Sequence, residues 1–250
     1  MRSPLVVFLF AFVLQHLSIQ IGSYFCKRKG GLEDNHRKDL DVILTALLTL
    51  LGLIIGFSFS MAVTRYDLRK GYEETEANAI GTEYFRVGLL PAADVMNTRE
   101  LLKKYLEQRI LFYESRDERE LQQINAQTVH LQSELWSTVQ ISASAQPTPI
   151  IALVVSGMND VLNSQAYTQA AWWNRIPVGA WLLMGAVAII ANFLLGYGTF
   201  STNEGIIRLL ALPLVLCIAF FLIADIDSPR RGIIFVRPQN LISLAQSIHS

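Results

Sequence analysis

One stripe of a long apolar segment carries side chains that can contact an ion. Five residues follow spacings of four, four, three and four: Thr49, Leu53, Phe57, Ser60 and Thr64. A helix turns by about 100° per residue, so these side chains share one narrow face. Hydroxyl groups donate hydrogen bonds to a partly dehydrated anion, and an aromatic ring presents its positive edge to it. The stripe predicts a face that changes from apolar to hydroxylic.

A second interpretation of the stripe stays open, because Ser and Thr in membrane helices commonly bond to carbonyl groups of their own helix or pack against another helix. Arg65 and Arg69 follow where the segment becomes charged. They either raise the anion concentration at a pore mouth or anchor the helix end among lipid headgroups. Spacing alone does not decide between these roles.

Motifs of catalysis and cofactor binding are missing from the sequence. It has no phosphate-binding glycine loop, no Gly-x-Ser-x-Gly elbow, and no Cys and His set with metal-ligand spacing. The histidines are isolated, and a structural or solvated role is expected for each: His16, His36, His130 and His249. We therefore expect no enzymatic activity, no cofactor and no metal site.

Apolar residues make up 52% of the sequence, charged residues only 17%, and the formal net charge is zero. This balance indicates no nucleic-acid partner. The apolar residues gather into four runs, each near the roughly 20 residues that cross a bilayer. We predict an all-helical membrane protein with four transmembrane helices at about 4–25, 40–63, 178–197 and 206–224.

Between the second and third spans the sequence predicts a helical extramembrane domain. Asn97, with Glu100 three residues later, resembles a capping box that opens an amphipathic helix. Pro147 and Pro149 end the helical pattern, and a further helix is expected over 149–173. The predicted plan is a hairpin (1–63), a helical domain (64–177), a second hairpin (178–224) and a polar C-terminal tail (225–250).

Orientation follows from the Lys and Arg residues near the spans. With both termini and the middle domain in the cytoplasm, eight such residues lie inside and six outside. This narrow excess favours a cytoplasmic middle domain.

The segment "EANAIGTEYF" begins at Glu76 and has two interpretations. Small and apolar residues at helical spacing indicate close packing against a neighbouring helix or subunit: Ala77, Ala79, Ile80 and Gly81. The other interpretation is ligand binding by Glu76, Asn78 and Glu83. The acidic exit "DIDSPRRG" either pairs with the extramembrane helices or is solvated.

Three stretches carry a family resemblance: "GFSFSMAVTRY" (56–66), "EANAIGTEYFRVGLLP" (76–91) and "DIDSPRRGIIFV" (225–236). Together they resemble the bacterial bestrophin-like family of unassigned function over nearly the whole chain. The first stretch alone is similar to the second transmembrane helix of bestrophins. The resemblance implies a bacterial inner-membrane protein that assembles with copies of itself.

In bestrophins this helix lines the pore of a pentameric anion channel, and three apolar residues at i, i+4 and i+8 form its neck. The matching positions here are Thr49, Leu53 and Phe57. The threonine departs from the bulky apolar pattern, which leaves the length of the neck open. No acidic cluster matches the calcium sensor of some animal bestrophins, so calcium dependence is not expected. The implied function is passive permeation of chloride or other small anions.

A different class of function remains open. Two membrane hairpins that flank a helical domain also suit a non-conducting sensor or scaffold, whose helical domain binds a partner.

Overall fold

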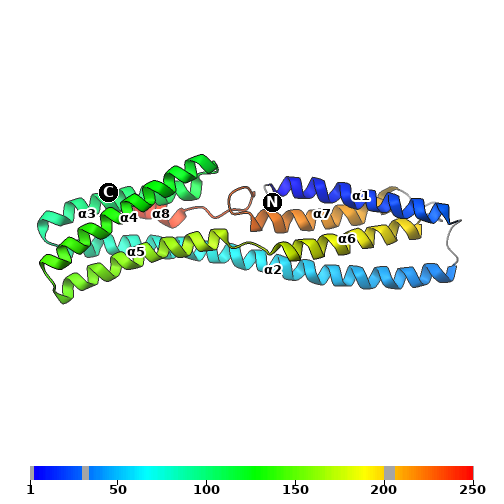
Figure 1. Cartoon of the computed structure of the whole chain (residues 1–250), viewed down its shortest axis with the longest axis horizontal. Helices are drawn as coiled ribbons and strands as arrows, with labels where there is room; N and C mark the ends of the chain where they lie inside the picture. The colour runs from blue at the N-terminus through cyan, green and yellow to red at the C-terminus, as the bar shows by residue number, and fades with distance from the viewer. Residues whose placement is uncertain (1–2, 30–33, 200–205, 250) are drawn as a thin grey trace. The chain divides into compact units, whose positions relative to one another are not determined.

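The structure is a computed structural model that describes residues 3–29, 34–199 and 206–249. All the regular elements in these ranges are helices (Figure 1). Four of them are long and apolar enough to cross a membrane. The predicted all-helical class with four candidate spans is confirmed, and the chain is an integral membrane protein.

The chain divides into two compact units, and the first comprises residues 1–64 and 175–234. It contains the spans α1 (Pro4–Arg28), α6 (Val178–Thr199) and α7 (Ile206–Asp227), together with the first part of the long α2 (Asp34–Arg86). Helix α1 packs against both α6 and α7.

Two glycines allow α1 and α6 to approach closely. A β-carbon on Gly22 would lie 2.1 Å from the carbonyl oxygen of Phe193, and one on Gly196 would lie 2.1 Å from that of Ile19. In lipid, such backbone proximity replaces the hydrophobic driving force that packs helices in water. The hydroxyl group of Ser23 adds a hydrogen bond to the Gly196 carbonyl at 3.0 Å.

A buried polar group joins the three spans. The side-chain amide of Asn192 on α6 donates to the Gln15 Oε1 atom on α1 at 3.1 Å. Gln15 in turn donates to the Cys217 sulfur on α7 at 3.3 Å. Hydrogen bonds between spans stabilise their register, because an unpaired amide in hydrocarbon is costly.

The second unit comprises residues 65–174 and 235–250. It contains the second part of α2, a short 3-10 helix η1 (Val87–Leu89), and helices α3 (Ala92–Glu114), α4 (Glu118–Ala145), α5 (Pro149–Trp173) and α8 (Gln239–His249). Helix α4 packs against α3 and α5, and α8 packs against α3.

The predicted break before α5 and the predicted helix over 149–173 are confirmed, and Thr148 caps its N-terminus by accepting from the Ile151 amide. The predicted N-cap at Asn97 is wrong. Helix α3 begins at Ala92 instead, directly after Pro91. Pro91 cannot continue the preceding helix, whereas the residues between it and Asn97 are compatible with helix.

Fully buried side chains from five helices form the core of this unit. Among them are Ile80, Leu102, Leu135, Met158 and Leu241. Each such side chain contributes about 1.5–3 kcal/mol through removal from water.

The C-terminal segment was expected to be a polar tail, but it returns to this core through α8. The buried Leu241 and the partly buried Leu244 and Ile248 pack there. Their spacing of three and four residues places them on one apolar face of a helix. This spacing indicates an amphipathic helix, which the mostly polar composition of the segment concealed.

Candidate functional site

The predicted stripe lies on the face of α2 that points away from its own unit. Leu51, Ser58 and Ala62 are buried and mark the packed face. With about 100° per residue, the stripe lies on average about 200° around the axis from that face. All five of its members are exposed: Thr49, Leu53, Phe57, Ser60 and Thr64. The two large apolar members, Leu53 and Phe57, are 56% and 65% exposed.

Among the candidate spans in the described residues, α2 also has the smallest buried share. Only 11% of its most apolar window is buried, compared with 50% for α7. A span of this kind must be covered by lipid, by a neighbouring subunit, or by water in a pore, because the protomer itself leaves it open.

Two of the stripe's hydroxyl groups bond to their own helix. The Thr49 hydroxyl donates to the carbonyl of Thr45 at 2.8 Å, and the Thr64 hydroxyl donates to that of Ser60 at 3.0 Å. Such bonds satisfy the polar groups of an exposed helix face at no cost in packing. The Ser60 hydroxyl makes no such bond in the described part of the chain, so it keeps its donor for another partner.

The two arginines after the span differ in environment. Arg65 is half-buried. Arg69 is 1% exposed and donates to the carbonyls of Ala171 and Asn174, at 3.3 and 3.2 Å. These carbonyls end α5, where helices lack backbone donors and favour a cation. Arg69 therefore caps α5 rather than standing exposed at a mouth.

The segment "EANAIGTEYF" packs inside its own unit. Ala77 and Ile80 belong to the buried core, and Ala79 is partly buried against it. A β-carbon on Gly81 would lie 2.9 Å from a methyl group of Leu244 on α8. Within the protomer, these small residues thus pack against the helices of their own unit.

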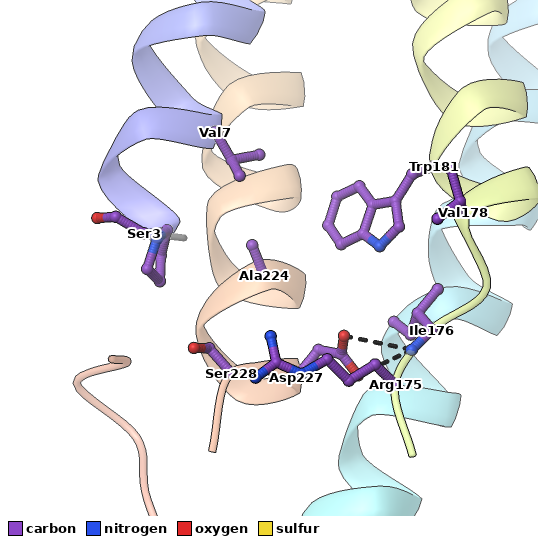
Figure 2. Close-up of a pocket in the computed structure, with 10 residues that line it drawn as sticks. Ser3, Val7, Arg175, Ile176, Val178, Trp181, Ala224, Asp227 and Ser228 are labelled. Atoms are coloured by element: carbon purple, nitrogen blue, oxygen red, sulfur yellow. Dashed lines mark hydrogen bonds between the residues drawn. The ribbon is translucent and has the colours of Figure 1, made fainter. Parts of the chain in front are cut away.

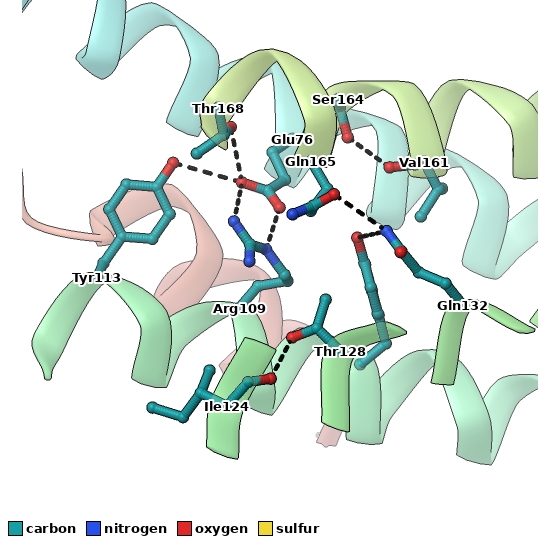
Figure 3. Close-up of polar contacts among 11 residues, drawn as sticks. Glu76, Arg109, Tyr113, Ile124, Thr128, Gln132, Val161, Ser164, Gln165 and Thr168 are labelled. Atoms are coloured by element: carbon teal, nitrogen blue, oxygen red, sulfur yellow. Dashed lines mark hydrogen bonds and ion pairs between the residues drawn. The ribbon is translucent and has the colours of Figure 1, made fainter. Parts of the chain in front are cut away.

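Glu76 is the centre of a buried polar cluster that the sequence did not identify (Figure 3). Its carboxylate pairs with the Arg109 guanidinium, and both side chains are fully buried. The carboxylate also accepts from the Tyr113 hydroxyl at 3.3 Å and from the Thr168 hydroxyl at 3.1 Å. The cluster joins α2, α3 and α5 at one point.

The cluster shifts the acidity of its members. Burial and the nearby Glu76 carboxylate raise the pKa of Tyr105 and Tyr113, so both phenols stay protonated. Burial alone would lower the pKa of Arg109, but the contact with Glu76 raises it overall. The pair has the character of a structural link, because the Glu76 carboxylate already accepts from Arg109, Tyr113 and Thr168 and a ligand would have to displace these bonds, although the Arg109 Nη1 atom has no hydrogen-bond partner among the described residues.

A second buried carboxylate, Glu73, organises α8. It accepts from the backbone amides of Asn240 and Leu241, at 2.9 and 3.0 Å, and from the side-chain amide of Asn240 at 2.6 Å. A carboxylate at the N-terminus of a helix accepts hydrogen bonds from backbone amides that have no partner within the helix. It is also attracted by the positive end of the helix dipole.

Glu83 has no such partners. It is fully buried, and neither carboxylate oxygen has a hydrogen-bond partner among the described residues. Burial raises its pKa from 4.5 to about 8, an effect that Arg86 opposes and Asp160 reinforces. A β-carbon on Gly157 of α5 would lie 1.8 Å from its Oε2 atom, so the carboxyl group occupies the space of that missing side chain.

The carboxylates of Asp225 and Asp227, at the end of α7, accept hydrogen bonds from backbone amides. The Asp225 carboxylate accepts from the Ile233 amide at 2.8 Å and from the Ile234 amide at 2.8 Å. That of Asp227 accepts from the Ile176 amide at 3.1 Å. Among the described residues no group of three His, Cys, Asp or Glu side chains is placed to hold a metal ion.

No protein-family model matches the chain, and no curated protein matches it. Solved structures do. A bacterial bestrophin homologue from Klebsiella pneumoniae is 13% identical with a TM-score of 0.67, over 95% of this chain and 98% of that chain. Two single-residue variants of it match at 11% and 13% identity, with TM-scores of 0.70 and 0.69. The first match covers 97% of this chain and 99% of the variant's chain. The second covers 99% of this chain and 96% of the variant's chain. The chain therefore has the fold of bacterial bestrophin homologues over nearly its whole length.

Proposed function

We propose that the protein is an oligomeric, bestrophin-like channel of a bacterial inner membrane, through which chloride or another small anion passes passively. The pore is lined by the α2 stripe. The observation that carries the proposal is the direction of this stripe, which points away from the face that α2 packs against its own unit. The fold shared with bacterial bestrophin homologues supports the same assignment.

The exposed stripe has the composition of a pore wall with two parts. Leu53 and Phe57 form an apolar constriction, which gates by dewetting. Ser60 and Thr64 continue the same face as a wet vestibule. Because Thr64 donates to its own helix, contact with a dehydrated anion falls to Ser60 and to the edge of the Phe57 ring.

A closed pore requires several copies of the chain. One protomer presents the stripe on its outside, so only a ring of α2 helices encloses it. Resemblance to bestrophins sets the expected number at five. The narrow excess of Lys and Arg residues favours the cytoplasm for the helical unit. Arg65 lies one residue beyond the stripe and adds positive charge at the mouth.

The proposal is tested in planar bilayers under a chloride gradient. Wild-type protein is expected to give a reversal potential near the chloride equilibrium value. Phe57→Ala should change the permeability ratio of chloride to sodium. Phe59→Ala is the matched control, because Phe59 lies on the same helix about 160° around the axis from Phe57. It should leave the ratio unchanged.

Absence of current from a verified, well-folded oligomer would contradict the channel and favour the sensor or scaffold. One feature of the helical unit favours that alternative. An open groove of about 430 Å³ between α2 and α5 is lined by polar side chains that include Asn78, Asp160 and Asn163. A partner's polar side chains fit such a surface better than an apolar helix does.

A further inference from the structure

Five carboxylate side chains are buried in the described part of the chain. Four of them accept hydrogen bonds: Glu73, Glu76, Asp225 and Asp227. The Asp227 carboxylate, for example, accepts from the Ile176 amide (Figure 2). Glu83 is the exception, because neither of its oxygens has a donor among the described residues. A buried carboxyl group without donors is more stable with its proton than without it.

The Glu83 carboxyl group shares a small niche with the Arg86 guanidinium. The niche is the space left by the missing side chain of Gly157 on α5. A β-carbon there would lie 1.8 Å from the Glu83 Oε2 atom and 2.7 Å from the Arg86 Nη1 atom. Residues three apart on a helix are neighbours, so both side chains reach this niche from α2. No hydrogen bond joins them in the structure.

Two charged groups act on Glu83 from the helices that enclose it. Arg86, on the same helix, favours the ionised carboxylate, and Asp160, on α5, opposes it. Both also line the open groove of about 430 Å³ between α2 and α5, and they are the only charged residues among those that line it. The state of Glu83 is therefore coupled to the charges of this groove.

Other elements near this part of α2 add little. Helix η1 has no titratable side chain. Arg99 of α3 donates to the Tyr84 carbonyl and lies over the Tyr84 ring, so it is directed at that residue. The one titratable residue of α8 is its last, His249. Among the described side chains, Arg86 and Asp160 are thus the charges that decide the state of Glu83.

We propose that Glu83 and Arg86 form a proton-controlled switch in the wall of the groove between α2 and α5. While Glu83 holds its proton, the Arg86 guanidinium is available to the groove and balances Asp160. When the proton leaves to solvent, the buried carboxylate attracts Arg86, which moves into the niche beside Gly157 and forms an ion pair. The groove then keeps only the negative charge of Asp160. A charged ligand or partner at the groove would sense this change as a change in affinity.

The switch works just above neutral pH. Burial raises the pKa of Glu83 to about 8, so its proton is lost between about pH 7 and 9. Removal of Arg86 should raise this pKa further, because Arg86 stabilises the ionised form. An Arg86→Gln variant should therefore keep the proton on Glu83 at a pH where the wild type has lost it.

The test is a double-mutant cycle on the full-length protein in mild detergent, followed by thermal unfolding at pH 6 and pH 9. At pH 9, Arg86→Gln should lower the melting temperature of the wild type by about 2–4 °C. It should change that of Glu83→Gln little, because no carboxylate is left to pair with. At pH 6, Arg86→Gln should have the same effect in both backgrounds.

A surface pair on α3 provides the control. Glu100 and Lys103 are also three residues apart, and both side chains are accessible to solvent. Solvated glutamate and lysine are charged at both pH values, so the coupling between Glu100→Gln and Lys103→Gln should not change with pH.

Infrared spectroscopy detects the proton itself. The difference spectrum between wild type and Glu83→Gln should contain the carbonyl band of a protonated carboxyl group at pH 6 and lose it at pH 9. The difference spectrum between Arg86→Gln and the double variant Glu83→Gln/Arg86→Gln should still contain the band at pH 9.

Any of three results would overturn the switch. Equal effects of Arg86→Gln in both backgrounds at pH 9 would mean that Arg86 does not pair with Glu83. Coupling as large at pH 6 as at pH 9 would identify a permanent ion pair. A carboxyl band that is absent at pH 6, or unchanged at pH 9 in the wild type, would show that Glu83 does not titrate in this range. None of these results depends on whether the protein conducts ions.

Discussion

Replacing Arg109 by methionine should destabilise the helical unit by about 3–5 kcal/mol, the usual loss when one partner of a buried ion pair is removed. The guanidinium is fully buried against Glu76, so Arg109→Met leaves a carboxylate in the core with only the Tyr113 and Thr168 hydroxyls as donors. A surface pair on the same helix provides the control. Lys103 contacts Glu100 at 3.8 Å near solvent, and Lys103→Met should cost at most about 1 kcal/mol.

Hydrogen exchange followed by mass spectrometry measures this loss segment by segment in the intact protein. Peptides of α3 and α5 should exchange faster in Arg109→Met, because opening of the unit becomes easier. The double variant Glu76→Gln/Arg109→Met should recover much of the loss, since it leaves no buried charge. A cost below about 1 kcal/mol for Arg109→Met, or losses that simply add in the double variant, would refute the reasoning.

Three further predictions concern single contacts. The pKa of Glu83 is raised to about 8 in the folded state, so stability falls as pH rises from about 4.5 to 8. The Glu83→Gln variant should have a higher melting temperature than the wild type at pH 8 and the same melting temperature at pH 4.5. Equal melting temperatures at pH 8 would contradict this prediction. Gly196→Ala places a β-carbon against backbone of α1 and should cost about 1–3 kcal/mol in thermal unfolding. A β-carbon on Gly198 meets no atom within 4 Å, so Gly198→Ala should lower the free energy of unfolding little. Equal losses of stability in Gly196→Ala and Gly198→Ala would refute the packing argument. Glu73→Ala removes the N-terminal cap of α8 and should destabilise this helix by about 1 kcal/mol, so hydrogen exchange should become faster in α8 alone. Unchanged exchange in α8 would exclude the capping role of Glu73.

The membrane helices were predictable because length and hydropathy are local properties. A run of about 20 apolar residues has few alternatives to a span. Prolines and polar caps are equally local, which is why the break before Pro149 was found. The start of α3 was missed because Asn97 imitates an N-cap inside a helix whose true start follows Pro91.

Partners in space were not predictable from one sequence. Nothing near Glu76 in the chain indicates Arg109, 33 residues away, or Thr168, 92 residues away. Arg69 looked like a surface charge because the α5 carbonyls that it caps lie about a hundred residues further along. The stripe of α2 was found because helical periodicity alone places its members on one face.

An image of the intact oligomer tests the central claim most directly. A map at side-chain resolution should show several copies of α2 around an axis, with Leu53 and Phe57 directed toward a water-filled pore along it. Leu53 and Phe57 directed into lipid, or an axis occupied by α1 or α6, would contradict the proposed pore.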